Sequence, residues 1–228
     1  MTATMEAPVA VADLRWRGRV PLAFLLPVGA AAVAVLRYVM PYETTDSAKE
    51  IAREVAAHQG TQSAVVWLGF VASLTMVPAV LVATKLARRE APRLAAFAAT
   101  LMIAGYLSLA WLCASDAAVL FTVRHGMSVA DSADAYESLH PVMIVAGAIF
   151  VVGHVVGTVL LGTAFLRGST IPRWAAIALI ACQPLHFFAA VILSSHELDL
   201  FAWGLNAFVF AVIASVVLRM SDQDWAAA

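Results

Sequence analysis

Long uninterrupted runs of apolar residues, separated by short polar segments, dominate this chain. The runs reach about 18 residues or more, which is the length that a helix needs to cross a bilayer. The alternating polarity of barrel strands is absent from the sequence. Because backbone amides in lipid must be satisfied internally, we expect an all-α, polytopic transmembrane bundle of about six spans. The expected spans are 20–40, 63–84, 94–115, 141–166, 174–193 and 200–218.

Two of the polar segments have the pattern of short helices, which we expect on the outer face. One begins at a cap on Asp46 or Ser47 and runs to about residue 58, and the other covers 128–139 with its first serine as the cap. The apolar run of the third span continues well past its expected end, apart from Asp116. Either this helix projects about two turns beyond the membrane, or the chain bends near Asp116.

Composition supports a membrane protein and narrows the chemistry. Hydrophobic residues make up 62% and charged residues 13% of the chain, whereas soluble domains have roughly 45–50% and 25%. The net charge of −1 argues against a nucleic-acid partner. The two cysteines, Cys113 and Cys182, lie inside apolar runs without the spacing of metal sites. We therefore expect neither a metal nor a cofactor. A divalent metal at the outer surface is an alternative that is not favoured, because nothing fixes the geometry of the candidate ligands His140, His196, Glu197, Asp199 and Asp116.

The basic residues are distributed unevenly between the two sides of the predicted bundle. One side has only Arg37, Lys49, Arg53 and Arg124. The other has Arg15, Arg17, Arg19, Lys85, Arg88, Arg89, Arg93, Arg167, Arg173 and Arg219. Because cytoplasmic loops are enriched in Lys and Arg, both termini are expected in the cytoplasm. The segments 1–19 and 220–228 then flank a single membrane domain over 20–219, and the Ala- and Arg-rich composition is typical of a bacterial inner-membrane protein.

Ionisable and strongly polar residues within spans are the candidates for function, because burying them in lipid is costly. We assign acid/base roles to His186 and Asp116, with Glu197 or Asp199 at the outer boundary as further candidates. Asp199 shares a helix face with Trp203 and Asn206, at spacings of four and then three. Gln183 and His186 are three residues apart, so they share a helix face. The prediction is that Gln183, His186 and Asn206 point into one space between the fifth and sixth spans, reached by Tyr106 or Asp116 from the third. The expected binding residues are Gln183, Asn206, Tyr106, Trp203, His154 and His140.

Each of these polar residues also has a purely structural interpretation. Gln, Asn and His commonly join membrane helices by hydrogen bonds worth about 0.6–2 kcal/mol without any chemistry. Arg37 can reach the interface or pair with Asp116 or Glu43. A haem held by two histidines is disfavoured, because counting from the span ends places His154 roughly 8–10 Å deeper than His186.

Pro184 is expected to distort the fifth span beside the polar residues. A proline has no N–H, so the carbonyl of Ile180 loses its usual helical donor. A nearby side chain or water is expected to replace this donor. An opened helix at this point would suit a binding site or a transport path.

The Ile171-Pro172-Arg173-Trp174 loop and the glycine-rich fourth span resemble uncharacterised six-helix bacterial membrane proteins, a resemblance that implies no activity. From the residues, we expect an outward-opening polar pocket that binds or transforms a lipophilic small molecule, such as an isoprenoid or lipid. An enzyme of this kind would be an acid/base catalyst, for example a cyclase or isomerase. The alternatives are a regulatory or scaffold protein and a small oligomeric transporter. Membrane lipids and a second copy of the chain are the expected partners.

Overall fold

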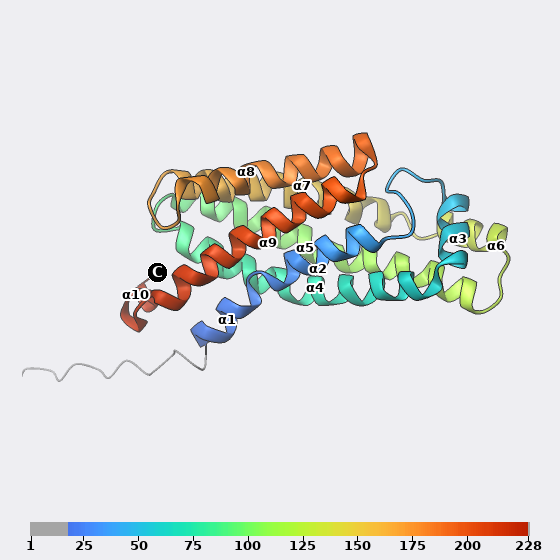
Figure 1. The fold of residues 1–228 in the computed structure, drawn as a ribbon, viewed down its shortest axis with the longest axis horizontal. Helices are drawn as coiled ribbons and strands as arrows, with labels where there is room; N and C mark the ends of the chain where they lie inside the picture. Colours follow the sequence, from blue (N-terminus) through green and yellow to red (C-terminus); the bar gives the residue numbers. More distant parts are fainter. Residues whose placement is uncertain (1–17, 228) are drawn as a thin grey trace, which may run out of the picture.

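The computed structural model describes residues 18–227, and helices make up nearly all of this part of the chain (Figure 1). No strand occurs between residues 18 and 227, which confirms the all-α prediction. The N-terminal segment expected over 1–19 lies almost wholly outside the described residues. In chain order the helices are α1 (Val20–Leu25), α2 (Val28–Val39), α3 (Ala48–Ala57), α4 (Gln59–Ala87), α5 (Pro92–Arg124), α6 (Val129–Glu137), α7 (Val142–Leu166), α8 (Arg173–Phe187), the π-helix η2 (Phe188–Leu193), α9 (His196–Arg219) and α10 (Asp222–Ala227).

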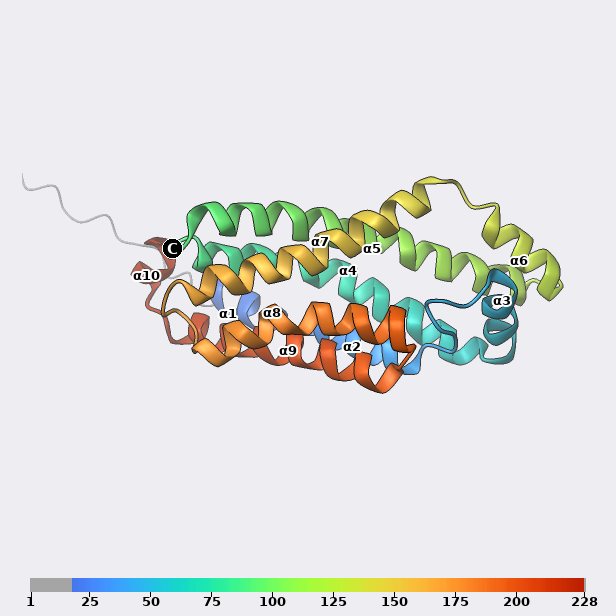
Figure 2. The same ribbon diagram turned by 90° about the horizontal axis from the view of Figure 1, so that it is seen from above.

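Six helical stretches among the described residues are long and apolar enough to cross a membrane, and they fit an integral, multi-pass membrane protein. They extend along the long axis of the molecule in both ribbon views (Figures 1 and 2). The prediction of about six spans is therefore confirmed. The stretches are Val20–Val39, Gln59–Ala87, Pro92–Arg124, Val142–Leu166, Arg173–Leu193 and His196–Arg219.

The two ends of the bundle differ (Figure 1). We call the end that carries α3 and α6 the cap end, and the end that carries α10 the base end. The α3 helix has a capping box: the Ser47 side chain accepts from the backbone N–H of Glu50, while the Glu50 carboxylate accepts from the backbone N–H of Ser47 at 2.9 Å. Ser128 caps α6 in the same manner through Asp131. The prediction of two short helices, each capped by a serine, is thus confirmed.

The helices at the cap end are longer than the expected spans. The α5 helix continues without a break through Asp116 to Arg124, so the third span projects rather than bends. The chain turns between α3 and α4 at His58, and α4 begins at the next residue. Gly60 consequently lies inside α4 and does not end the preceding helix.

Proline and π-helical geometry shape two other spans. Pro27 separates α1 from α2 within the first span. In the fifth span the helix α8 continues through Pro184 to Phe187, and the last six residues of the span then form η2. The distortion therefore lies beyond Pro184. The Ile180 carbonyl was expected to need a new donor. The thiol of Cys182 donates instead to the carbonyl of the preceding residue, Leu179, at 3.2 Å.

Small residues decide how α7 packs, and this in turn makes room for the site. A Cβ on Gly153 would lie only 2.5 Å from the Leu101 carbonyl oxygen, so the backbones of α5 and α7 are in contact there. Nearer the base end, a Cβ on Gly162 would lie 2.9 Å from the Ala176 carbonyl oxygen of α8. From that contact α7 diverges from α8 and η2 toward the cap end (Figure 2).

Candidate functional site

A cavity of about 300 Å³ lies in the half of the bundle nearer the cap end. Its wall is mostly aliphatic and aromatic, with a few charged and imidazole groups among them. Residues of α2, α5, α7, α8, η2 and α9 and two residues of the α2–α3 loop line it: Val33, Leu36, Arg37, Met40, Thr44, Leu109, Leu112, Cys113, Asp116, Gly147, Phe150, Val151, His154, His186, Phe187, Ala190, Val191 and Trp203.

Asp199, in the first turn of α9, connects two of the charged or imidazole groups in the cavity wall. One of its carboxylate oxygens accepts from Nε of Arg37 at 2.5 Å, and the other lies 2.5 Å from Nδ1 of His186. The Asp199 side chain is only 1% exposed, while those of Arg37 and His186 are 11% exposed. A buried carboxylate needs such partners, because burial without compensation is costly. Helices α2, α8 and α9 are thus tied together at one point.

The contact with Asp199 fixes how His186 can act. With Nδ1 bonded to a carboxylate, the other ring nitrogen, Nε2, is the one left for a proton exchange. The ring packs against its neighbours, with centroid distances of 5.2 Å to Trp203 and 5.3 Å to His154. A carboxylate that orients an imidazole in this way is the arrangement of a general base with its positioning group.

Asp116 is a second buried carboxylate, and unlike Asp199 it lines the cavity itself. It accepts hydrogen bonds from the Tyr42 hydroxyl and, at 3.4 Å, from Nε2 of Gln62. Burial and the neighbouring Asp116 raise the pKa of Tyr42 well above its ordinary value. Tyr42 therefore keeps its proton at neutral pH and remains a donor to Asp116.

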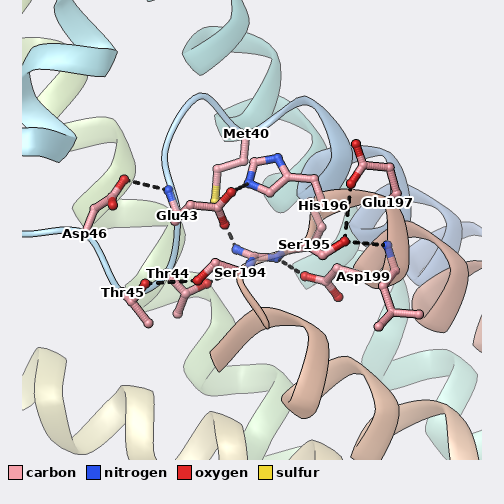
Figure 3. Close-up of polar contacts among 12 residues, drawn as sticks. Met40, Glu43, Thr44, Thr45, Asp46, Ser194, Ser195, His196, Glu197 and Asp199 are labelled. Atoms are coloured by element: carbon pink, nitrogen blue, oxygen red, sulfur yellow. Dashed lines mark hydrogen bonds and ion pairs between the residues drawn. The ribbon is translucent and has the colours of Figure 1, made fainter. Parts of the chain in front are cut away.

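The segment Met40–Ser47, here called the strap, crosses the cap-end side of the site and is pinned to the start of α9 (Figure 3). The Glu43 carboxylate lies 2.8 Å from Nε2 of His196, and the hydroxyls of Thr45 and Ser194 are 3.2 Å apart. Below the strap, Arg37 donates to the Thr44 hydroxyl at 2.7 Å. Ser194 has the left-handed backbone conformation, with φ 47°. These contacts hold the strap across the cap end of the cavity.

The structure brings four of the predicted site residues to the cavity wall: Asp116, His154, His186 and Trp203. Gln183, Asn206 and Tyr106 are fully buried, but they are not among the residues that line the cavity. Gln183, His186 and Asn206 were predicted to point into one space, but only His186 of the three lines the cavity. His140 is exposed at the end of the α6–α7 connection and is not part of the wall.

The structure gives Arg37 another partner than the alternatives that were considered, and it corrects one expectation about depth. Arg37 forms its ion pair with Asp199, whereas the sequence allowed it to reach the interface or to pair with Asp116 or Glu43. The rings of His154 and His186 are adjacent, although the count along the spans separated them in depth. That count assumed level helix ends and upright helices, whereas α7 is tilted relative to α8 (Figure 2). The depth argument against a site between the two histidines therefore fails.

Sequence reasoning missed the roles of Tyr42 and Gln62. It considered Asp199 as an acid/base candidate, but it did not predict the contacts of Asp199 with Arg37 and His186. Asp199 was placed at the outer boundary, where solvation is the ordinary fate of a carboxylate. Gln62 was one residue outside an expected span, and Tyr42 lies in a loop. The spacing of four and then three had placed Asp199 on one helix face with Trp203 and Asn206, but no local pattern indicated its partners on α2 and α8.

Within residues 18–227, no group of three or more His, Cys, Asp or Glu side chains is arranged to hold a metal ion. Comparison of the chain with protein-family models, with curated proteins and with solved structures finds no match. The geometry of the cavity is therefore the basis for a function.

Proposed function

We propose that the chain binds an amphiphilic, lipophilic small molecule in the cavity and acts on it by proton transfer. The apolar wall, with Phe150, Phe187 and Trp203, suits a hydrocarbon or isoprenoid body. Arg37, Asp116 and His186 suit a polar group at one end of that body. Ligand pockets commonly combine such an apolar lining with a few convergent polar groups.

The ligand enters sideways from the lipid. The strap covers the cap-end side of the cavity. Val151 on α7 and Phe187 and Val191 on the opposite wall line the cavity and are each partly exposed. Val151 belongs to α7, and Phe187 and Val191 belong to the end of α8 and to η2, where α7 diverges from α8 and η2 (Figure 2). A molecule dissolved in the bilayer would therefore reach the cavity without crossing water.

His186 serves as the acid/base group. The observation that carries this proposal is the 2.5 Å contact between Nδ1 of His186 and Asp199 at the wall of the cavity. Nε2 of His186 takes a proton from the ligand or returns one, and Asp199 holds the ring and stabilises its charged form. An isomerisation or cyclisation fits, because it moves protons and needs no oxidant.

The setting is the inner membrane of a bacterium, with both termini in the cytoplasm. The segments rich in Lys and Arg, around residues 85–93 and 167–173, are at the base end. At the cap end, α6 is acidic, and α3 has as many acidic as basic residues. The positive-inside rule then places the base end in the cytoplasm and the cavity in the outer half of the membrane.

Filling the cavity tests ligand binding. Gly147 lines the cavity, and a Cβ there would approach nothing closer than 3.8 Å, so Gly147→Leu occupies the cavity without a backbone clash. Gly204→Leu is the matched control, because Gly204 is on α9, has open space beside it and does not line the cavity. Lipophilic molecules that co-purify with each protein are extracted and quantified by mass spectrometry.

The wild type and Gly204→Leu are expected to retain one enriched lipophilic species, and Gly147→Leu to lose most of it. Equal profiles for all three folded proteins would refute the proposal. His186→Gln then separates chemistry from packing: it is expected to retain the species while abolishing its conversion. If the wild type retains no species and His186→Gln only lowers the melting temperature, the protein is a scaffold.

A further inference from the structure

The charges in the cavity wall do not balance. Arg37 is the only Lys or Arg among the described residues that line the cavity, and its charge is matched by Asp199 at 2.5 Å. All three guanidinium nitrogens have partners: Nε donates to Asp199, and the other two donate to Met40 at 3.0 Å and to Thr44 at 2.7 Å. Asp116 is bonded only to neutral donors in the described chain. The wall therefore has one carboxylate without an ion-pair partner.

One oxygen of Asp116 is free to take a partner from the cavity. The Tyr42 hydroxyl and Nε2 of Gln62 both donate to the same oxygen, Oδ1. The other oxygen, Oδ2, has no hydrogen bond with the described residues, and they do not shield it from a water-sized molecule. Because Asp116 lines the cavity, a group bound there can reach this oxygen. A carboxylate in an apolar wall needs a donor, and a cationic donor compensates its burial best.

His186 provides a second open acceptor. Asp199 is paired with Arg37 and only accepts, so Nδ1 of the neutral His186 ring carries the proton. Nε2 then has a lone pair, and like Oδ2 of Asp116 it is neither bonded nor shielded within the described chain. Both open positions therefore accept hydrogen bonds.

The head group of the ligand follows from these positions. A fatty acid or a phosphate ester would place an anion against the unpaired carboxylate, and such like-charge contacts are costly. Arg37 would not offset this cost, because its charge is already matched by Asp199. A neutral alcohol would donate a hydrogen bond but would leave the charge of Asp116 uncompensated. An ammonium group both donates and compensates.

The rest of the wall suits a cation with an apolar body. Phe150, Phe187 and Trp203 line the cavity, and aromatic rings attract cations as well as hydrocarbon. The volume of about 300 Å³ is at the lower end for ligand pockets, which favours one hydrocarbon chain over a two-chain lipid. We propose that the ligand of the cavity is a lipophilic amine, whose ammonium group binds Asp116. This inference rests on the proposed function, because it names the class of molecule that the cavity binds.

Equilibrium dialysis of the detergent-solubilised protein against radiolabelled decylamine, decanol and decanoate at neutral pH tests the proposal. The probes share one chain length and differ in the charge of the head group, and protein-free micelles correct for partitioning. The wild type is expected to bind decylamine about tenfold or more tightly than decanol, because the ion pair adds to the same burial of the chain, and to bind decanoate least. Displacement of decylamine by phosphatidylethanolamine would support the ammonium site and identify a membrane lipid as its source.

Asp116→Asn keeps the size of the side chain and an oxygen that can accept from Tyr42 and Gln62. It is expected to reduce the affinity for decylamine to that for decanol. Asp134→Asn is the matched control, because it removes the same charge from an exposed position on α6 outside the cavity wall. An equal loss of affinity in both variants would overturn the inference.

The ranking of the probes on the wild type decides the matter even if Asp116→Asn does not fold. Equal affinities for the three probes, a preference for decanoate, or no binding at all would overturn the inference. Equal binding that is lost in Gly147→Leu would show a cavity that takes lipophilic molecules without selecting a cation. In that case the proposed function stands and only the amine is wrong.

Discussion

At the scale of single residues, Asp199 and Asp116 show how a carboxylate can be kept inside an apolar bundle. Asp199 has a guanidinium and an imidazole as partners, each at 2.5 Å. Asp116 has no basic group among its bonded partners in the described chain and depends on two neutral donors, Tyr42 and Gln62. The Tyr42 bond is therefore expected to matter for stability, because few other groups compensate the burial of Asp116.

Tyr42→Phe is expected to lower the free energy of unfolding by about 1–3 kcal/mol, since it removes a hydrogen-bond donor from a shielded acceptor. Tyr38→Phe is the control: Tyr38 is 51% exposed on α2, and its hydroxyl has no role in this network. Thermal or denaturant unfolding in the same detergent measures both. Equal effects of the two substitutions would show that the Tyr42 bond contributes nothing.

The raised pKa of Tyr42 adds a dependence on pH. A group that holds its proton more tightly when folded stabilises the protein below its unfolded pKa, which is about 10 for tyrosine. The stability lost in Tyr42→Phe should therefore be constant up to about pH 10 and shrink as the pH rises above it. A difference that grows above this pH would contradict the assignment.

At the scale of elements, the packing of α7 determines whether the cavity exists. Gly153 lets α7 touch α5 backbone to backbone, and Gly162 does the same against α8 nearer the base end. Between that lower contact and the cap end, α7 and η2 diverge (Figure 2). The glycines of α7 are thus not equivalent, because a Cβ on Gly147 of the same helix would meet only Leu112, at an ordinary contact distance of 3.8 Å.

Gly153→Ala and Gly147→Ala are therefore expected to change stability in opposite directions. The new Cβ at Gly153 would lie 2.5 Å from a backbone oxygen of α5, which forces the helices apart and costs about 1–3 kcal/mol. At Gly147 the same change meets no close atom and gains helix propensity, up to about 1 kcal/mol. Melting temperatures of the two variants measure this, and a stabilised Gly153→Ala would disprove the close crossing.

At the scale of the whole molecule, the two ends of the bundle carry different charge, and this sets the expected orientation. Reporters fused after Met220 or within 86–92 are expected to report a cytoplasmic location. Reporters within 47–58, which includes α3, are expected outside. Paired fusions to alkaline phosphatase and a fluorescent protein give opposite readings at each site. An external reading from 86–92 would reverse the orientation and place the cavity in the inner half of the membrane.

The sequence by itself determined the helical class, the number of spans and the two short cap-end helices. These follow from local rules: the length of an apolar run, the pairing of Ser47 with Glu50, and the cost of an unpaired amide in lipid. The sequence also showed which polar residues turn inward, because a polar side chain exposed to lipid costs free energy. His186, Asp116, His154 and Trp203 were found in this way.

Only the tertiary structure decided which of those residues meet. Depth along a span was counted from assumed ends, but the tilt of α7 brings His154 beside His186, and the strap brings Tyr42 to Asp116. Asp199 joins Arg37, which is 162 positions away in the chain. No local pattern encodes such a pairing, because it depends on how helices lean and cross, and this is set by contacts such as the one at Gly153.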